Sequence, residues 1–122
     1  MTLEAASLSL EERLQRAIAL RIEGKYDDAE RELRGILEVM PEHAAAHREL
    51  GLVFNFTGFF DESIEELRRS VELDAHDLDT RVHLALAYAM LGMNDEAKAE
   101  LEAVLEIDPA HAGAQRHIVY FR

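Results

Sequence analysis

The chain of 122 residues is 48% hydrophobic and 31% charged, which is enough for one folded domain with its own core. Its net charge of −12 argues against nucleic-acid binding, which needs a basic surface, and the lack of cysteine excludes disulfides, thiolate nucleophiles and zinc–thiolate sites. No apolar run is long enough to cross a membrane and the first residues do not resemble a signal peptide, so we expect a cytoplasmic protein without membrane insertion.

Seven helices are predicted, because apolar residues recur along the chain at three- and four-residue steps. In chain order they span residues 9–23, 27–39, 44–57, 61–73, 78–91, 95–107 and 112–121. The first helix is expected to begin with a capping box made by Ser9 and Glu12, and residues 1–8 are expected to be frayed or lightly packed. The sequence therefore predicts an all-α fold.

Three glycines, Gly24, Gly58 and Gly92, stand 34 residues apart and are predicted to end the first, third and fifth helices in a left-handed conformation. The same residue types recur at fixed distances from each glycine. Small residues stand seven positions before the glycine (Ala17, Gly51, Ala85) and five after it (Ala29, Ser63, Ala97). A large apolar residue stands four before it (Leu20, Phe54, Tyr88), and a leucine stands nine after it (Leu33, Leu67, Leu101). Small residues let crossing helices approach closely. The chain is therefore read as three two-helix units followed by a last helix.

The second helix of each unit also has predicted start and stop signals. An acid three residues after each glycine, Asp27, Asp61 or Asp95, is predicted to cap it by accepting a bond from its free N–H groups. Pro41 and Pro109 are predicted to stop it in units one and three, whereas unit two has Ala75 at that place.

This pattern resembles the tetratricopeptide repeat (TPR), a 34-residue helix–turn–helix. The matching residues of unit two are Leu50-Gly51, Phe54, Gly58, Phe60, Ser63, Leu67 and Ser70; those of unit three are Leu84-Ala85, Tyr88, Gly92, Ala97, Leu101, Leu105 and Pro109; and those of unit one are Ala17, Leu20, Gly24, Tyr26, Ala29, Leu33, Leu37 and Pro41. The chain departs from the family pattern at Arg13, Arg16, His47, Ala75, Arg81 and Asn94. The resemblance implies a right-handed superhelix of antiparallel helices. It also implies a single domain over residues 1–122, with repeats at about 10–43, 44–77 and 78–111 and a capping helix at 112–122.

In this family the first helix of each unit lines a concave groove that holds a peptide or a partner helix. Carried over by repeat position, the groove residues here are Leu14, Ile18, Arg21, Ile22, Arg48, Leu52, Asn55, Phe56, Val82, Leu86, Ala89, Met90, Arg116 and Tyr120. Most are apolar, three are arginine and none is acidic. The family's carboxylate clamp for acidic chaperone tails needs Lys and Asn where this chain has Leu14 and Ile18, so that specificity is not expected.

The resemblance implies a protein-interaction module, an adaptor, scaffold or co-chaperone-like protein. The expected partner is an amphipathic helix or extended segment with apolar anchors and acidic flanks. Two alternatives stay open. One places Leu52 and Leu86 in the core and pairs the arginines with nearby acids. In the other the groove holds no partner segment, either because the protein's own terminus fills it or because the chain is a self-assembly unit. Such a unit would oligomerise through its groove or through a last helix exposing Ile118, Val119 and Phe121.

Four of the five phenylalanines cluster around Gly58. Phe54 and Phe60 occupy aromatic positions of the repeat and are predicted to be core. Phe56 is the strongest predicted partner contact, and the repeat does not account for Phe59.

Catalytic and metal chemistry are not expected. His43 with His47, and His83 with His117, lack a third ligand, and the acid pairs Asp27-Asp28, Asp61-Glu62 and Asp95-Glu96 recur at every second-helix start, where they suit the helix dipole. No phosphate loop or nucleophile–base arrangement is visible. We therefore expect no enzyme activity, cofactor or metal.

Overall fold

A computed structural model describes residues 8–122 of the chain, which form α-helices, one 3-10 helix and no strand. The elements are α2 (Leu10–Ile22), α3 (Tyr26–Val39), α4 (Ala44–Thr57), α5 (Phe60–Leu73), α6 (Leu78–Met90), α7 (Asn94–Ile107), α8 (Ala112–Ile118) and the 3-10 helix η1 (Val119–Phe121). The predicted all-α fold is confirmed. The last α-helix is shorter than predicted because its final turn is 3-10. The expectation of fraying falls mostly on residues 1–7, outside the described part.

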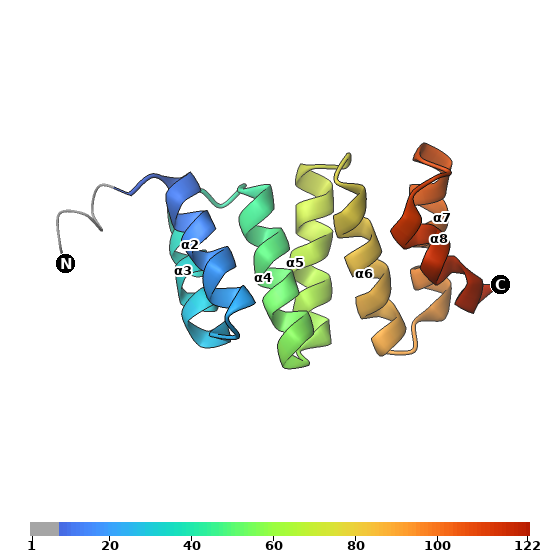
Figure 1. The fold of residues 1–122 in the computed structure, drawn as a ribbon, viewed down its shortest axis with the longest axis horizontal. Helices are drawn as coiled ribbons and strands as arrows, with labels where there is room; N and C mark the ends of the chain where they lie inside the picture. Colours follow the sequence, from blue (N-terminus) through green and yellow to red (C-terminus); the bar gives the residue numbers. More distant parts are fainter. Residues whose placement is uncertain (1–7) are drawn as a thin grey trace.

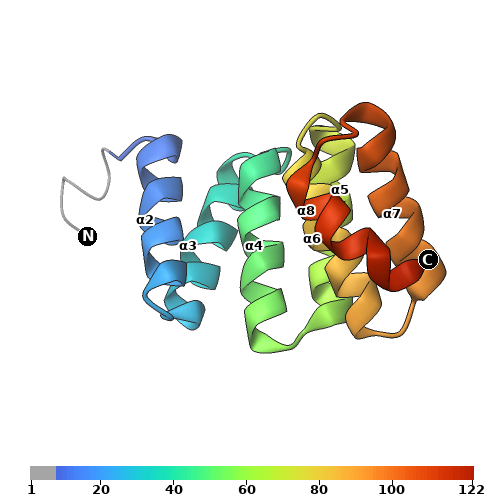
Figure 2. The same ribbon diagram turned by 45° about the vertical axis from the view of Figure 1, so that its right-hand side comes forward.

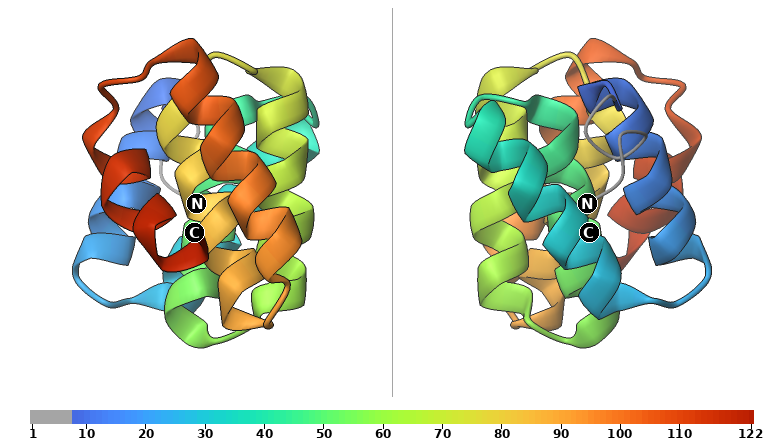
Figure 3. Two further views of the ribbon diagram at one scale, coloured as in Figure 1. Left: turned by 90° about the vertical axis from the view of Figure 1, so that its right-hand side faces the viewer. Right: turned by 90° about the vertical axis from the view of Figure 1, so that its left-hand side faces the viewer.

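The helices stack in chain order as a row of antiparallel pairs (Figure 1). The view from the C-terminal end of the row shows α2 and α8 on one side and α5 on the other, with α7 crossing between them (Figure 3, left). At the end of the row α8 packs against both α6 and α7 (Figure 2). The turns that join α2 to α3, α4 to α5 and α6 to α7 all lie along the same edge of the row, here called the turn edge.

Each of these turns is built on a left-handed glycine, as predicted, with φ of 80° at Gly24, 85° at Gly58 and 74° at Gly92. The residue after the glycine donates its N–H to a carbonyl five residues back, as from Phe59 to Phe54 at 2.9 Å. This bond belongs to the Schellman motif, which often adds a hydrophobic contact between the same two residues. The rings of Phe59 and Phe54 meet edge to face at 6.3 Å. The structure thus accounts for Phe59, which the repeat pattern leaves unexplained.

The predicted capping role of Asp27, Asp61 and Asp95 is wrong. The second helices begin one residue earlier than predicted, so these acids lie within the first turn, and the N-cap residues Lys25, Phe59 and Met93 make no side-chain cap bond. The acids still favour the helix electrostatically, because the N-terminus of a helix carries partial positive charge.

Side-chain caps are instead found at the first helices, again with a spacing of 34 residues. Ser9, His43, Asp77 and His111 each accept a hydrogen bond from the N–H three residues on, and Ser9 completes the predicted capping box with Glu12. Serine, aspartate and the Nδ1 of a neutral histidine share one property, an acceptor close to the backbone. The proline stops are not essential, because α5 ends at Leu73, the place equivalent to the ends of α3 and α7, without a proline after it.

Buried apolar residues form two clusters, one within α2 to α4 and one from α5 to α8. Between them, α5 turns two fully buried serines toward α4. Ser70 donates to the Ala44 carbonyl at 2.9 Å, and the Ser63 hydroxyl lies 2.8 Å from the Gly51 carbonyl and 2.7 Å from the Asn55 side chain. Units one and three have apolar residues at both serine positions. The middle of the row is therefore joined by hydrogen bonds as well as by apolar packing.

Candidate functional site

A mainly apolar pocket of about 310 Å³ lies between the first helices of units two and three. It is lined by Leu52, Asn55, Phe56, Phe60, His83, Leu86 and Met90. Five of these seven belong to the predicted groove set: Leu52, Asn55, Phe56, Leu86 and Met90. We call this site the α4/α6 pocket. Since Phe56 lies in the last turn of α4, Met90 ends α6 and Phe60 begins α5, the pocket reaches the turn edge.

Phe56 is held at the pocket while 60% of its surface stays exposed. Its ring stacks on that of Tyr26, with 5.9 Å between the ring centres. The Arg21 guanidinium lies over the Phe56 ring, 6.0 Å from its centre. Contacts of this kind restrain an aromatic side chain without burying it. Phe60, predicted to be core, is only half-buried and contributes to the pocket wall, whereas Phe54 is buried as predicted.

The other predicted groove residues lie elsewhere. Leu14 and Val82 are buried in the two core clusters and are closed to a partner in this structure. Ile18 and Ala89 are partly buried and packed against those clusters, and Ile22 is exposed on α2. Arg116 and Tyr120 are exposed on α8 and η1, apart from the residues that line the pocket.

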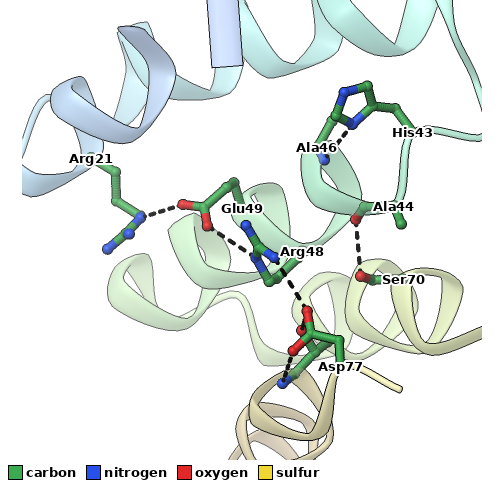
Figure 4. Close-up of polar contacts among 9 residues, drawn as sticks. Arg21, His43, Ala44, Ala46, Arg48, Glu49, Ser70 and Asp77 are labelled. Atoms are coloured by element: carbon green, nitrogen blue, oxygen red, sulfur yellow. Dashed lines mark hydrogen bonds and ion pairs between the residues drawn. The ribbon is translucent and has the colours of Figure 1, made fainter. Parts of the chain in front are cut away.

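Two of the three arginines of the predicted groove, Arg21 and Arg48, belong to a network of ion pairs across three helices (Figure 4). Glu49 accepts from Arg21 Nε at 2.8 Å and from Arg48 Nε at 3.2 Å. Arg48 Nη1 then reaches Asp77 at 3.2 Å, and Asp77 also accepts from the Thr80 hydroxyl at 2.7 Å. The Glu49 side chain is 5% exposed, so both of its oxygens are bonded out of contact with bulk water. The network joins α2, α4 and α6.

This network changes the predicted charge of the groove. Arg21 and Arg48 pair with nearby acids, as one of the alternatives from the sequence proposed. The two acids, Glu49 and Asp77, are absent from the predicted groove set. Burial by itself raises the pKa of Asp77, but the bonds from Thr80 and Arg48 outweigh it and lower the pKa below its ordinary value. The charges of Arg21 and Arg48 are therefore balanced by those of Glu49 and Asp77, and the network adds no net positive charge beside the pocket.

His83 is the one titratable group that lines the pocket. Its burial lowers the pKa of the imidazole below the ordinary value, against the opposing effect of Asp79, Asp77 and Glu49 nearby. The ring that faces the pocket is therefore neutral at neutral pH. It can exchange hydrogen bonds with a bound segment without adding charge.

Three other histidines, His43, His47 and His111, have structural contacts. His43 and His111 are N-caps, and His47 bridges Glu66 at 2.6 Å and the Pro41 carbonyl at 2.8 Å. Within residues 8–122 no three His, Asp or Glu side chains are grouped to hold a metal ion.

The C-terminal end is less exposed than predicted. Ile118, the last residue of α8, is 4% exposed within the core cluster of α5 to α8, and Phe121 is partly buried against the same cluster. Only Val119 and Tyr120 remain as exposed large apolar side chains there. The predicted apolar face of the last helix is thus mostly covered.

Comparisons with known proteins agree on one family. Two sequence profiles, both described as tetratricopeptide repeat, match residues 14–77 and 57–116. A search of curated proteins found no match. No helix among the described residues has the length and hydropathy of a membrane span.

Solved structures with the same fold share little sequence with this chain. The first TPR of Spaghetti (RPAP3), bound to the HSP90 peptide SRMEEVD, superposes with a TM-score of 0.86 at 18% identity, covering 92% of this chain and 89% of that one. The second TPR domain of human RPAP3, in complex with the HSP70 peptide SGPTIEEVD, gives 0.83 at 19% identity, with coverages of 89% and 91%. MamA gives 0.88 at 24% identity, with coverages of 98% and 70%.

Proposed function

Because the chain belongs to the tetratricopeptide repeat family, we propose that it is a protein-interaction module, a cytoplasmic adaptor or scaffold that holds a segment of a partner protein in the α4/α6 pocket. The observation that carries the proposal is Phe56, a large aromatic side chain kept exposed beside an apolar cavity. An aromatic residue that is already restrained loses little entropy when it is covered, which favours its use as a binding anchor. We propose that residues 1–122 act as one domain of three repeats and catalyse no reaction.

The bound partner is expected to differ from those of the RPAP3 domains. Their peptides end in the acidic sequence EEVD. In this chain the positions implied for a carboxylate clamp are the buried Leu14 and the partly buried Ile18, neither of which can donate a hydrogen bond from its side chain. We therefore propose an apolar side chain of the partner as the group that enters the pocket.

Replacing Phe56 by alanine tests this proposal. The purified protein is panned against a displayed library of short random peptides, and the affinities of the recovered peptides are measured for the Phe56→Ala and Phe59→Ala variants. Phe56→Ala should weaken binding by about tenfold or more, since truncating an aromatic anchor at the centre of an interface costs roughly 2 kcal/mol.

Phe59→Ala is the matched control, because Phe59 is similarly exposed, at 55%, and does not line the pocket. Its affinity should stay within about twofold of the parent. Equal losses in both variants, or recovery of no peptide that depends on Phe56, would remove the pocket as the binding site. Light scattering on the free protein examines the alternative of self-assembly, since a Phe56-dependent dimer would mean that a second copy occupies the pocket.

A further inference from the structure

We infer that the partner segment carries basic residues beside its apolar anchor, the opposite of the acidic flanks expected from the sequence. This inference rests on the proposed function and specifies the chemistry of the partner.

Exposed acids follow two of the pocket residues along the chain, at the turn edge. Phe60, which lines the pocket, is followed directly by Asp61 and Glu62 in the first turn of α5. Met90 leads through the next turn to Asp95 and Glu96 in the first turn of α7. All four side chains are exposed, and none forms an ion pair within residues 8–122.

The cations of the ion-pair network and the histidine of the pocket wall do not offset these acids. Arg21 and Arg48 are neutralised by Glu49 and Asp77, and His83 in the pocket wall carries no charge at neutral pH. Taken together, the network, the pocket wall and the four acids carry a net negative charge, in keeping with the net charge of −12 of the whole chain. A lysine or arginine beside the anchor would be attracted, and a carboxylate there would be repelled.

The peptide selection described above tests the inference through the composition of the recovered sequences. Peptides that depend on Phe56 should be enriched in Lys and Arg within a few residues of a large apolar residue and depleted of Asp and Glu. Their affinity should fall when the ionic strength is raised to about 0.5 M, because exposed charges are then screened.

A quadruple variant, Asp61→Asn, Glu62→Gln, Asp95→Asn and Glu96→Gln, identifies the acids responsible. It should weaken binding of a recovered basic peptide by about three- to tenfold, as expected for several exposed ion pairs, and leave a peptide with glutamine in place of its basic residues unchanged. The control variant changes four exposed acids at the opposite ends of the second helices or in the loop that follows: Glu38→Gln, Glu42→Gln, Glu72→Gln and Glu106→Gln. It should bind like the parent protein.

The two proposals fail in different ways. Recovered peptides that depend on Phe56 but are acidic or show no charge preference would overturn the basic partner and leave the pocket standing. Equal weakening by the two quadruple variants would also overturn it, by pointing to net charge alone. Failure to recover any Phe56-dependent peptide would overturn the proposed function itself.

Discussion

Replacing Leu67 by alanine is expected to lower the free energy of unfolding by about 3–4 kcal/mol, a large share of the stability of a domain of this size. Leu67 is fully buried and its side chain fills the space left by the missing side chain of Gly51. A Cβ built on Gly51 would lie 2.6 Å from Leu67 Cγ. Truncation therefore leaves a cavity next to bare backbone, which cannot close by a side-chain shift alone. Urea unfolding followed by circular dichroism measures the loss.

A double-mutant cycle makes this prediction specific to the Gly51–Leu67 contact. Gly51→Ala alone should destabilise the protein, since the clash costs about 1–3 kcal/mol and the gain in helix propensity is at most about 1 kcal/mol. In the Leu67→Ala background the same substitution should stabilise, because the new methyl group enters the cavity. Additive effects of the two substitutions would show that the contact does not determine how α4 packs on α5.

Replacing Glu49 by alanine is expected to cost about 2–3 kcal/mol of stability. Removing one member of a buried ion pair costs about 3–5 kcal/mol, and the cost is reduced here because Arg21 and Arg48 are 18% and 30% exposed and can turn toward water. The loss should persist at high ionic strength, since buried charges are weakly screened. Chemical unfolding at low and high salt measures both quantities.

The control for Glu49 is Glu32, which forms an ion pair of 2.9 Å with Arg16, close to the 2.8 Å between Glu49 and Arg21. The side chains of Glu32 and Arg16 are 26% and 44% exposed. Glu32→Ala should cost less than about 1 kcal/mol, and raising the salt concentration should reduce that cost further. If Glu49→Ala and Glu32→Ala cost the same, the network does not hold α2, α4 and α6 together.

The fold was predictable because residues within each repeat determine where its helices begin and end. Gly24, Gly58 and Gly92 define the register, since a left-handed residue at the end of a helix favours glycine strongly. The capping positions were harder to recognise. Serine, histidine and aspartate differ in the sequence although Ser9, His43 and Asp77 perform the same task, and the conspicuous acids after the turns proved not to be caps.

Repeat position predicted residues that line the pocket, but it did not predict the acids that neutralise the arginines beside it. Phe56 and Met90 follow from repeat position, but Glu49 does not, because units one and three have Gln15 and His83 there and the role of Glu49 depends on arginines from its own and a neighbouring unit. Contacts between units are specific to this chain and leave no periodic signal. The same reason explains Phe60, whose half-buried ring contributes to a cavity shared by two units.

Methionine methyl NMR tests the central claim, that a partner segment occupies the α4/α6 pocket. The chain has four methionines, and Met→Leu variants assign their methyl signals. Met90 lines the pocket, whereas Met40, the 44% exposed C-cap of α3, does not. Adding the tightest-binding peptide from the selection should shift the Met90 signal, leave Met40 in place, and have no effect on Met90 in Phe56→Ala. A shift of Met40 with Met90 unchanged would contradict the account.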